Sequence, residues 1–392
     1  GTFEEKQLIA ILHNKFTETD MRFQIPISSE RKINWLIKNN QIKSSNGDSN
    51  KEIDENRIVN RLDFLMDLLE KDEEFSGVVA IEKDDKRMYQ RVVGHANKSY
   101  NISNKIDTKF NIASVGKIFT GVAITQLVER GLLSFDDTLG KFIGPEWLNP
   151  EVSNKILIKH LLTHTSGLGD YFKDAYSQNK EPVFRRHSDY KSLISDDSLN
   201  FEPGSNFSYS NTGMLLLGVV IENITKVDYF EFLKQNIFEP AGMLNSYGYF
   251  KDRPVSNRAT GYTKIYEGNN VNWDNNQFTR IMRGTASGGV YSTAEDLLKF
   301  ARAIKMNKLL SEKYVDLLYE GRPELKASFH SYAFFLESGN NGKVLSHKGD
   351  GRGMNCQFKL YLDSGYTIVV LSNYSAPSAN IVANAIEQLM GS

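Results

Sequence analysis

A serine and a lysine stand three residues apart in Ser-Val-Gly-Lys, residues 114–117, directly before a long apolar run. At that spacing both side chains share one face of the first turn of a helix. The free N–H groups of a helix N-terminus favour a developing negative charge. Burial of the lysine lowers the pKa of its amine, which then acts as a base toward the hydroxyl. Ser114 and Lys117 are therefore a candidate nucleophile and general base.

The same spacing also fits a capped helix start that carries a surface lysine. The sequence that follows decides between these interpretations, because residues 117–131 are apolar on nearly every side. A helix with that pattern is buried. A lysine at the start of a buried helix needs a partner or a cleft.

A second group of polar residues lies at 209–211, Tyr-Ser-Asn, before another apolar helix. A tyrosine near a lysine can have a lowered pKa and shuttle protons. An asparagine amide both donates and accepts hydrogen bonds, so Asn211 can orient the lysine and a substrate amide together. The alternative is that Tyr209 is a core aromatic residue and Asn211 a helix cap.

A third group is the glycine-rich stretch Leu-Ser-His-Lys-Gly-Asp-Gly-Arg-Gly, residues 345–353. We expect His347 and Gly349 to lie between strand-like segments, where glycines let a backbone edge approach a ligand closely. Such an edge supplies an oxyanion N–H and pairs with a peptide-like substrate. The alternative is a hairpin loop with a surface histidine.

The order of these three motifs resembles that of the serine β-lactamase and penicillin-binding family. The similarity is to the branch that contains class C β-lactamases, D-alanyl-D-alanine carboxypeptidases, D-aminopeptidases and related esterases, and it covers about residues 58–390. Four connecting stretches support the same branch, at residues 157–168, 203–222, 237–246 and 286–303.

This resemblance implies a role for each motif residue. Ser114 is the nucleophile that becomes acylated, and Lys117 is its base. Tyr209 relays protons and activates the deacylating water, and Asn211 holds the substrate and the lysine. The backbone N–H groups of Ser114 and Asp350 form the oxyanion hole.

The third motif departs from the pattern of the family, because His347 replaces a lysine that helps to bind a substrate carboxylate in β-lactamases. A neutral histidine does this less well, so we expect an esterase or peptidase-like hydrolase rather than a true β-lactamase. Asp350 departs from the small residue expected, and we expect Asp170 and Tyr171 to line the opposite wall. The two acids favour a substrate that carries a free amine or lacks a carboxylate.

Two other functions remain open. The first is a penicillin-binding sensor or binding protein that acylates without efficient turnover. The second is a weak class C-like β-lactamase. The first differs from a hydrolase only in the rate of deacylation, which the sequence does not specify.

Composition limits the possible partners. The formal net charge of −1 over 392 residues provides no field that would attract nucleic acid. No apolar run reaches the roughly 18 residues of a membrane helix. The single cysteine, Cys356, excludes an internal disulfide and a cysteine-based zinc site, and we expect it to be an inert core residue.

We expect no metal or cofactor. We interpret His164 as a structural residue and do not expect His160 to be a zinc ligand. The expected partner is a small-molecule or peptide-like substrate, with the oligomeric state open.

The elements around the motifs predict an α+β fold. A helix is predicted at 55–72, and strands at 76–83 and 87–96 are joined by a turn at Asp84-Asp85. Strands linked by short turns form antiparallel sheets, so both ends of the chain build one antiparallel sheet flanked by helices. The helical middle is an inserted lobe, and the resemblance implies a β-lactamase/transpeptidase-like arrangement. Further predicted elements are strands at 331–337, 354–363 and 366–373 and a helix at 378–390.

Residues 1–55 differ from the rest and are predicted to be a helical extension with a linker, before a hydrolase domain at 56–392. Helices are predicted at 3–16 and 28–40, with the polar linker behind them. The extension is interpreted as a partner or oligomer contact, or as a lid. The chain begins with Gly1 rather than Met, which is consistent with a removed targeting segment. The resemblance favours an extracytoplasmic or cell-envelope location.

Overall fold

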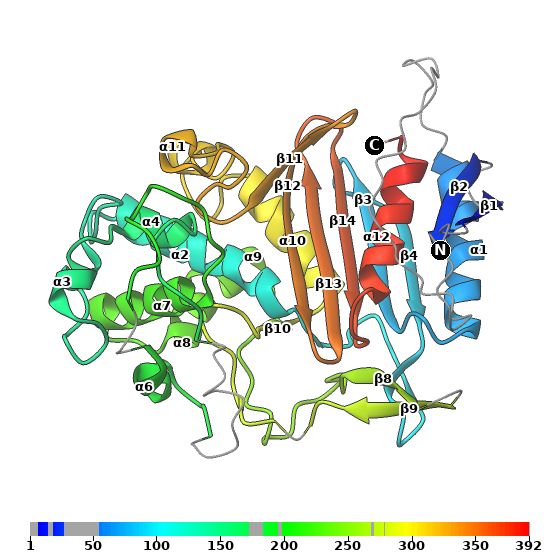
Figure 1. Ribbon diagram of the computed structural model, residues 1–392, viewed down its shortest axis with the longest axis horizontal. Coiled ribbons are helices and arrows are strands. Elements are labelled where there is room, and N and C mark those ends of the chain that lie inside the picture. Colours follow the sequence, from blue (N-terminus) through cyan, green and yellow to red (C-terminus); the bar gives the residue numbers. More distant parts are fainter. Residues whose placement is uncertain are drawn as a thin grey trace, which may run out of the picture.

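The computed structural model describes residues 7–14, 19–26, 55–171, 183–194, 198–267, 270–277 and 279–391. A sheet flanked by helices lies beside a lobe of helices (Figure 1). The sheet has the order β11-β12-β13-β14-β3-β4, with every neighbouring pair antiparallel. Its strands are β3 (Gly77–Lys83), β4 (Lys86–Val93), β11 (Phe335–Gly339), β12 (Gly342–Gly351), β13 (Met354–Tyr361) and β14 (Tyr366–Ser372).

The two ends of the folded region meet inside this sheet, as predicted. Asp84 and Asp85 both have positive φ, 47° and 63°, and close the β3–β4 hairpin. Two consecutive residues with positive φ match the right-handed twist of the flanking strands. Strand β14 pairs with β3 from Tyr366↔Lys83 to Ser372↔Gly77. The fold is thus the α+β arrangement expected from the sequence, and the chain closes its sheet with segments about 290 residues apart.

Helices cover both faces of the sheet. Helices α1 (Glu55–Lys71) and α12 (Ser378–Leu389) share one apolar cluster with Val79 and Ile81. Val78 and Ala80 belong to the cluster on the other face, where α10 (Ala294–Lys305) packs (Figure 1). Because side chains alternate along a strand, the continuous apolar run of β3 supplies both layers.

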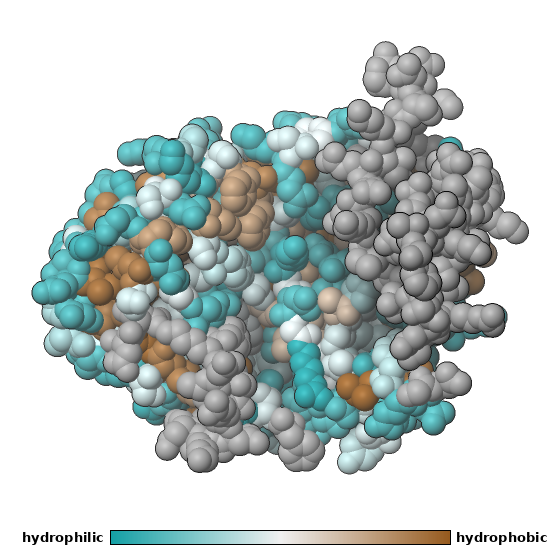
Figure 2. Space-filling model, viewed as in Figure 1, coloured by the Kyte–Doolittle hydropathy of each residue, from teal (hydrophilic) through white to brown (hydrophobic). Residues whose placement is uncertain are grey.

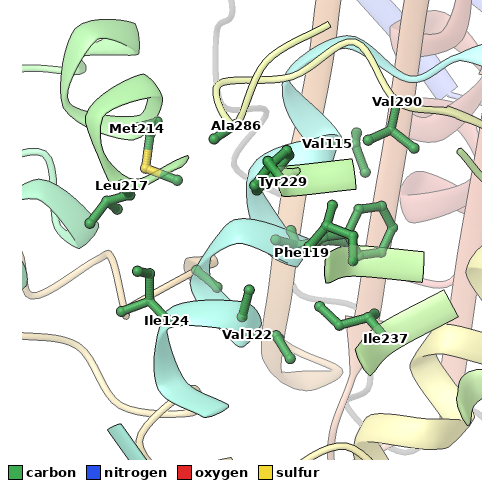
Figure 3. Close-up of a cluster of buried hydrophobic side chains, with 14 of the residues drawn as sticks. Val115, Phe119, Val122, Ile124, Met214, Leu217, Tyr229, Ile237, Ala286 and Val290 are labelled. Atoms are coloured by element: carbon green, nitrogen blue, oxygen red, sulfur yellow. The ribbon is translucent and has the colours of Figure 1, made fainter. Parts of the chain in front are cut away.

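The helical lobe is organised around α2 (Lys117–Glu129), whose residues 117–127 are all buried. Figure 3 shows Ile124 of α2 on the side of Met214 and Leu217 of the next long helix, and Phe119 on the other side, beside Ile237. A helix that is apolar on all sides is stable only when neighbours surround it. The lobe also contains η1 (Ala113–Gly116), η2 (Leu139–Lys141), α3 (Pro150–Ser153), α4 (Ile158–Leu162), η3 (His187–Tyr190), α6 (Lys191–Ile194), α7 (Asn211–Thr225), α8 (Tyr229–Leu233), η4 (Lys234–Phe238) and α9 (Glu239–Ala241).

Short strand pairs join the lobe to the sheet. Strand β7 (Phe110–Asn111) pairs with β10 (Tyr291–Ser292) just before the first motif. The remaining elements are β5 (His95–Asn97), β6 (Ile102–Ser103), β8 (Tyr262–Glu267), β9 (Asn270–Asn275), α11 (Glu312–Asp316) and η5 (Pro323–Leu325). The surface seen in Figure 2 is largely hydrophilic, with apolar patches over the lobe. Within the ranges described, no helix is both long and apolar enough to cross a bilayer.

Two local predictions were wrong. The helix predicted at 3–16 is replaced over 7–14 by strand β1 (Gln7–Asn14), which pairs with β2 (Thr19–Pro26). A short apolar run fits a helix or a strand, and the strand forms here because a second such run follows within hairpin distance. The predicted helix at 28–40 and the linker behind it lie outside the described residues. The strand predicted at 331–337 begins only at Phe335, because the Ser331 hydroxyl accepts hydrogen bonds from the N–H groups of Ala333 and Phe334 and forms a turn.

Candidate active site

Ser114 lies in the tight turn η1 at the N-terminal end of α2. The preceding Ala113 has φ +46°, a conformation that a non-glycine residue rarely adopts. The Ala113 carbonyl accepts a hydrogen bond of 3.1 Å from the N–H of Gly289, and its own N–H donates to Asn111 Oδ1 at 2.9 Å. These neighbours hold the serine in a strained turn, a feature common at reactive positions.

Lys117 is 1% exposed and its Nζ contacts three oxygen atoms. They are Ser114 Oγ at 3.1 Å, Asn211 Oδ1 at 2.7 Å and the Ser287 carbonyl at 2.5 Å. Burial lowers the pKa of Lys117 to about 7, although the charge of Asp170 acts in the opposite direction. A neutral amine has two N–H donors and one lone pair. With the donors directed to Asn211 and Ser287, the lone pair faces the hydroxyl of Ser114.

Asp170 fixes the orientation of Asn211. Its Oδ2 accepts hydrogen bonds from the Asn211 backbone N–H at 3.2 Å and from Nδ2 at 2.8 Å. Because the Nδ2 side of the amide is held by the carboxylate, Oδ1 faces Lys117. Asp170, which was expected to line a wall of the cleft, is partly exposed and makes a positioning contact with Asn211.

Tyr171 does not line the wall of the site, contrary to expectation. It is 3% exposed, and its hydroxyl is 2.7 Å from Ser287 Oγ. This contact holds Ser287 in place, and the backbone carbonyl of Ser287 accepts the hydrogen bond from Lys117 Nζ. Sequence reasoning missed Ser287, because a backbone carbonyl has no residue-type signature. The sequence gives one hint, the two glycines that follow Ser287. The structure shows that this segment lies close to the turn of Ser114, because a Cβ atom on Gly116 would be 3.3 Å from the Cα atom of Gly288.

Tyr209 lies beside both Ser114 and Lys117. Its hydroxyl is hydrogen-bonded to Ser114, and Lys117 Nζ is 4.8 Å from the centroid of its ring. Burial raises the pKa of Tyr209, whereas we expected the lysine to lower it. The buried surroundings outweigh the lysine because Lys117 itself tends toward neutrality, and the rings of His164 and Phe335 pack against Tyr209 at 4.4 and 6.4 Å.

His164 has the structural role that was predicted for it. Its Nδ1 accepts the N–H of Ser210 at 3.2 Å, and its carbonyl accepts the N–H of Ser208 at 2.8 Å. Both contacts hold the second motif against the loop after α4. His160 similarly accepts the N–H of Leu157 at 3.1 Å and caps α4. In the part of the chain that the structure describes, no three His, Cys, Asp or Glu side chains are grouped to hold a metal ion.

The third motif lies within strand β12 rather than between strands. A Cβ atom on Gly349 would be 2.2 Å from the Ile112 carbonyl, so only glycine lets this strand approach the turn that carries Ser114. Asp350 is exposed, and strand alternation places its side chain on the face opposite to His347. The site thus has one wall made of strand backbone.

His347 is 2% exposed, and its Nδ1–H donates to the Lys348 carbonyl at 2.9 Å. Burial, with Lys117 nearby, keeps the pKa of His347 well below its usual value, so the ring is neutral. His330 was not anticipated, yet its ring lies 5.0 Å from that of His164, and burial lowers its pKa to about 4. The wall behind Tyr209 and Lys117 is therefore made of uncharged rings. Nothing in the sequence spacing indicated that His330 belongs there.

Comparison with known proteins identifies the family of this chain. A family model described as β-lactamase matches residues 64–389. The chain belongs to the β-lactamase family. It is 27% identical to penicillin-binding protein 4* of Bacillus subtilis strain 168 over 327 residues, which cover 80% of this chain and 71% of that protein.

Solved structures show the same fold. A penicillin-binding protein from Bacillus halodurans superimposes with a TM-score of 0.74 at 32% identity, over 83% of this chain and 98% of that one. The D-amino acid amidase of Ochrobactrum anthropi superimposes with a TM-score of 0.70 at 21% identity, over 84% and 98% of the two chains. The second likeness concerns the fold alone.

Proposed function

We propose that this protein is a serine hydrolase that forms an acyl-enzyme on Ser114 and cleaves an ester or a D-amino-acid amide or peptide. The observation that carries the proposal is the environment of Lys117, whose pKa of about 7 and contacts to Ser114, Asn211 and Ser287 suit a base at neutral pH. Membership of a family that contains penicillin-binding proteins supports the same chemistry.

In the proposed first step, the Ser114 proton passes to the lone pair of Lys117 as Oγ attacks the substrate carbonyl carbon. The negative charge on the carbonyl oxygen is received by the backbone N–H groups of Ser114 and Asp350. Tyr209, kept protonated by its raised pKa, donates its proton to the leaving oxygen or nitrogen. It regains a proton from Lys117. The bond to the leaving group breaks, and the acyl group stays on Ser114.

In the proposed second step, water attacks the acyl-enzyme and its proton passes to Lys117, relayed by the Tyr209 hydroxyl, which gives up its own proton to Lys117 as it receives the one from water. The bond between Ser114 and the acyl carbon breaks, the acid is released, and the proton returns to Oγ. The proposed site contains no charge that would hold a substrate carboxylate at position 347, because His347 is neutral and buried. We therefore expect slow or absent turnover of β-lactams.

A four-probe experiment tests this proposal. The protein and its Ser114→Ala variant are incubated with an activated ester, a D-alanyl peptide, a β-lactam and a fluorophosphonate, and intact mass and turnover are followed. We expect a fluorophosphonate adduct and turnover of the ester or peptide, both lost in the variant. The absence of any adduct and of turnover would overturn the proposal. A persistent β-lactam adduct without turnover of any probe would favour a sensor.

A further inference from the structure

A separate hollow of about 520 Å³ lies beside the β7–β10 strand pair. Its walls come from Lys109, next to β7, and from chain segments between residues 244 and 256. Pockets of about 300–1,000 Å³ commonly hold small molecules. Its lining contains two basic side chains and no acidic one. None of the residues that surround Lys117 takes part in it.

Lys109 is the unusual member of this lining. It is 7% exposed, and its Nζ donates to the Ser256 carbonyl at 3.3 Å. Along the described residues we find no carboxylate within ion-pair distance of Lys109. An ammonium has three N–H donors, and burying its charge without a counter-charge is costly. An anion in the hollow would supply the missing counter-charge.

The second cation, Arg253, is carried by a well-held loop at residues 250–258. Arg258 fixes the loop by donating to the carbonyls of Phe250 at 3.0 Å and Lys251 at 2.9 Å. Asp252, the one acid in this loop, forms an ion pair with Arg185. Among the described residues Arg253 forms no ion pair of its own, although the charge of Asp252 lies near it.

Aromatic side chains form the rest of the wall. Tyr249 and Phe250 are partly exposed in the hollow, but the guanidinium groups of Arg253 and Arg283 lie over the ring of Phe250, at 4.6 and 4.7 Å, so Tyr249 offers the aromatic surface that is left for a ligand. An aromatic side chain contributes a large apolar contact area to a binding surface. A phosphate monoester carries a charge of about −1.5 to −2 at pH 7, which matches two cations better than the single charge of a carboxylate.

We propose that this hollow binds an organic phosphate monoester of sugar size. Lys109 and Arg253 hold the phosphate, and Tyr249 packs against the sugar ring. The site is independent of the proposed hydrolysis at Ser114 and involves no covalent step.

Isothermal titration of the full chain tests this site with glucose 6-phosphate, inorganic phosphate and glucose. We expect saturable one-to-one binding of glucose 6-phosphate, at least about tenfold weaker binding of inorganic phosphate, and no heat with glucose. Lys109→Met and Arg253→Gln should each weaken binding by about tenfold or more. The exposed Lys308→Gln variant is the matched control and should bind within about twofold of the parent.

Several results would overturn the proposal. These are no saturable binding at millimolar ligand, equal affinity for inorganic phosphate and the sugar phosphate, or binding that Arg253→Gln leaves unchanged. Arg253 is exposed, so its variant remains informative if Lys109→Met fails to fold. Binding by Ser114→Ala should equal that of the parent. Its loss there would assign the ligand to the active site and contradict a separate hollow.

Discussion

Replacing Lys117 by methionine tests whether this lysine is held neutral in the folded protein. The side chain is 1% exposed, and burial lowers its pKa from 10.5 to about 7. In the unfolded chain the same lysine keeps its ordinary pKa. Between pH 7 and 10.5 the unfolded state therefore binds a proton that the native state lacks.

The sign and the size of the effect follow from this difference. The free energy of unfolding rises with pH wherever the unfolded state binds more protons, by about 1.4 kcal/mol per pH unit for one proton. The cost of burying Lys117 is fully present below pH 7 and disappears as the pH approaches 10.5. Because half of the native molecules still carry the proton at pH 7, the parent should gain about 2 kcal/mol over Lys117→Met between pH 7 and 9.

Urea unfolding of both proteins at pH 7, 8 and 9 measures this gain. The difference between the two free energies removes the contribution of every other titrating group. The exposed Lys308→Met variant controls for the loss of a lysine as such. A difference that stays constant with pH, or that falls as the pH rises, would refute a neutral Lys117.

Three further results are expected. The rate of Ser114 acylation by an activated ester, followed by stopped flow, should rise about tenfold per pH unit below pH 7 and level off above about pH 8, because neutral Lys117 is the proposed base; a flat profile contradicts this. Asp170→Asn should move that profile to lower pH, because the carboxylate raises the pKa of Lys117; an upward shift would argue against the assignment. Gly349→Ala should reduce kcat/KM by about 100-fold or more, as its Cβ would lie 2.2 Å from the Ile112 carbonyl; unchanged kinetics would show that β12 adjusts freely.

The features predicted best from the sequence are those formed by residues close together along the chain. Ser114 and Lys117 share one helical turn, and the apolar residues behind them predicted the burial that lowers the lysine pKa. The antiparallel sheet followed from alternating strands and short turns. Contacts that depend on distant backbone were not predictable, because the carbonyl of Ser287 reaches Lys117 from 170 residues away and any residue type can supply it.

Errors arose where surroundings outweighed a local pattern. The motif around His347 was expected between strand-like segments, yet it lies within β12, where Gly349 lets the strand approach the turn that carries Ser114. Tyr209 was expected to have a lowered pKa because a lysine is near, but burial among rings from other segments raises it. Tyr171 was placed on the wall of the cleft from its position after a loop, while its hydroxyl is buried against Ser287. Each of these features depends on contacts between residues that are far apart in the sequence, and such contacts cannot be deduced from a local pattern.

Peptide mapping of the protein quenched during turnover of an activated ester tests the central claim most directly. The account predicts an acyl mass on the peptide that contains Ser114, which forms before the product appears and is absent from Ser114→Ala. An acyl group on any other residue, or undiminished turnover by Ser114→Ala, would contradict it.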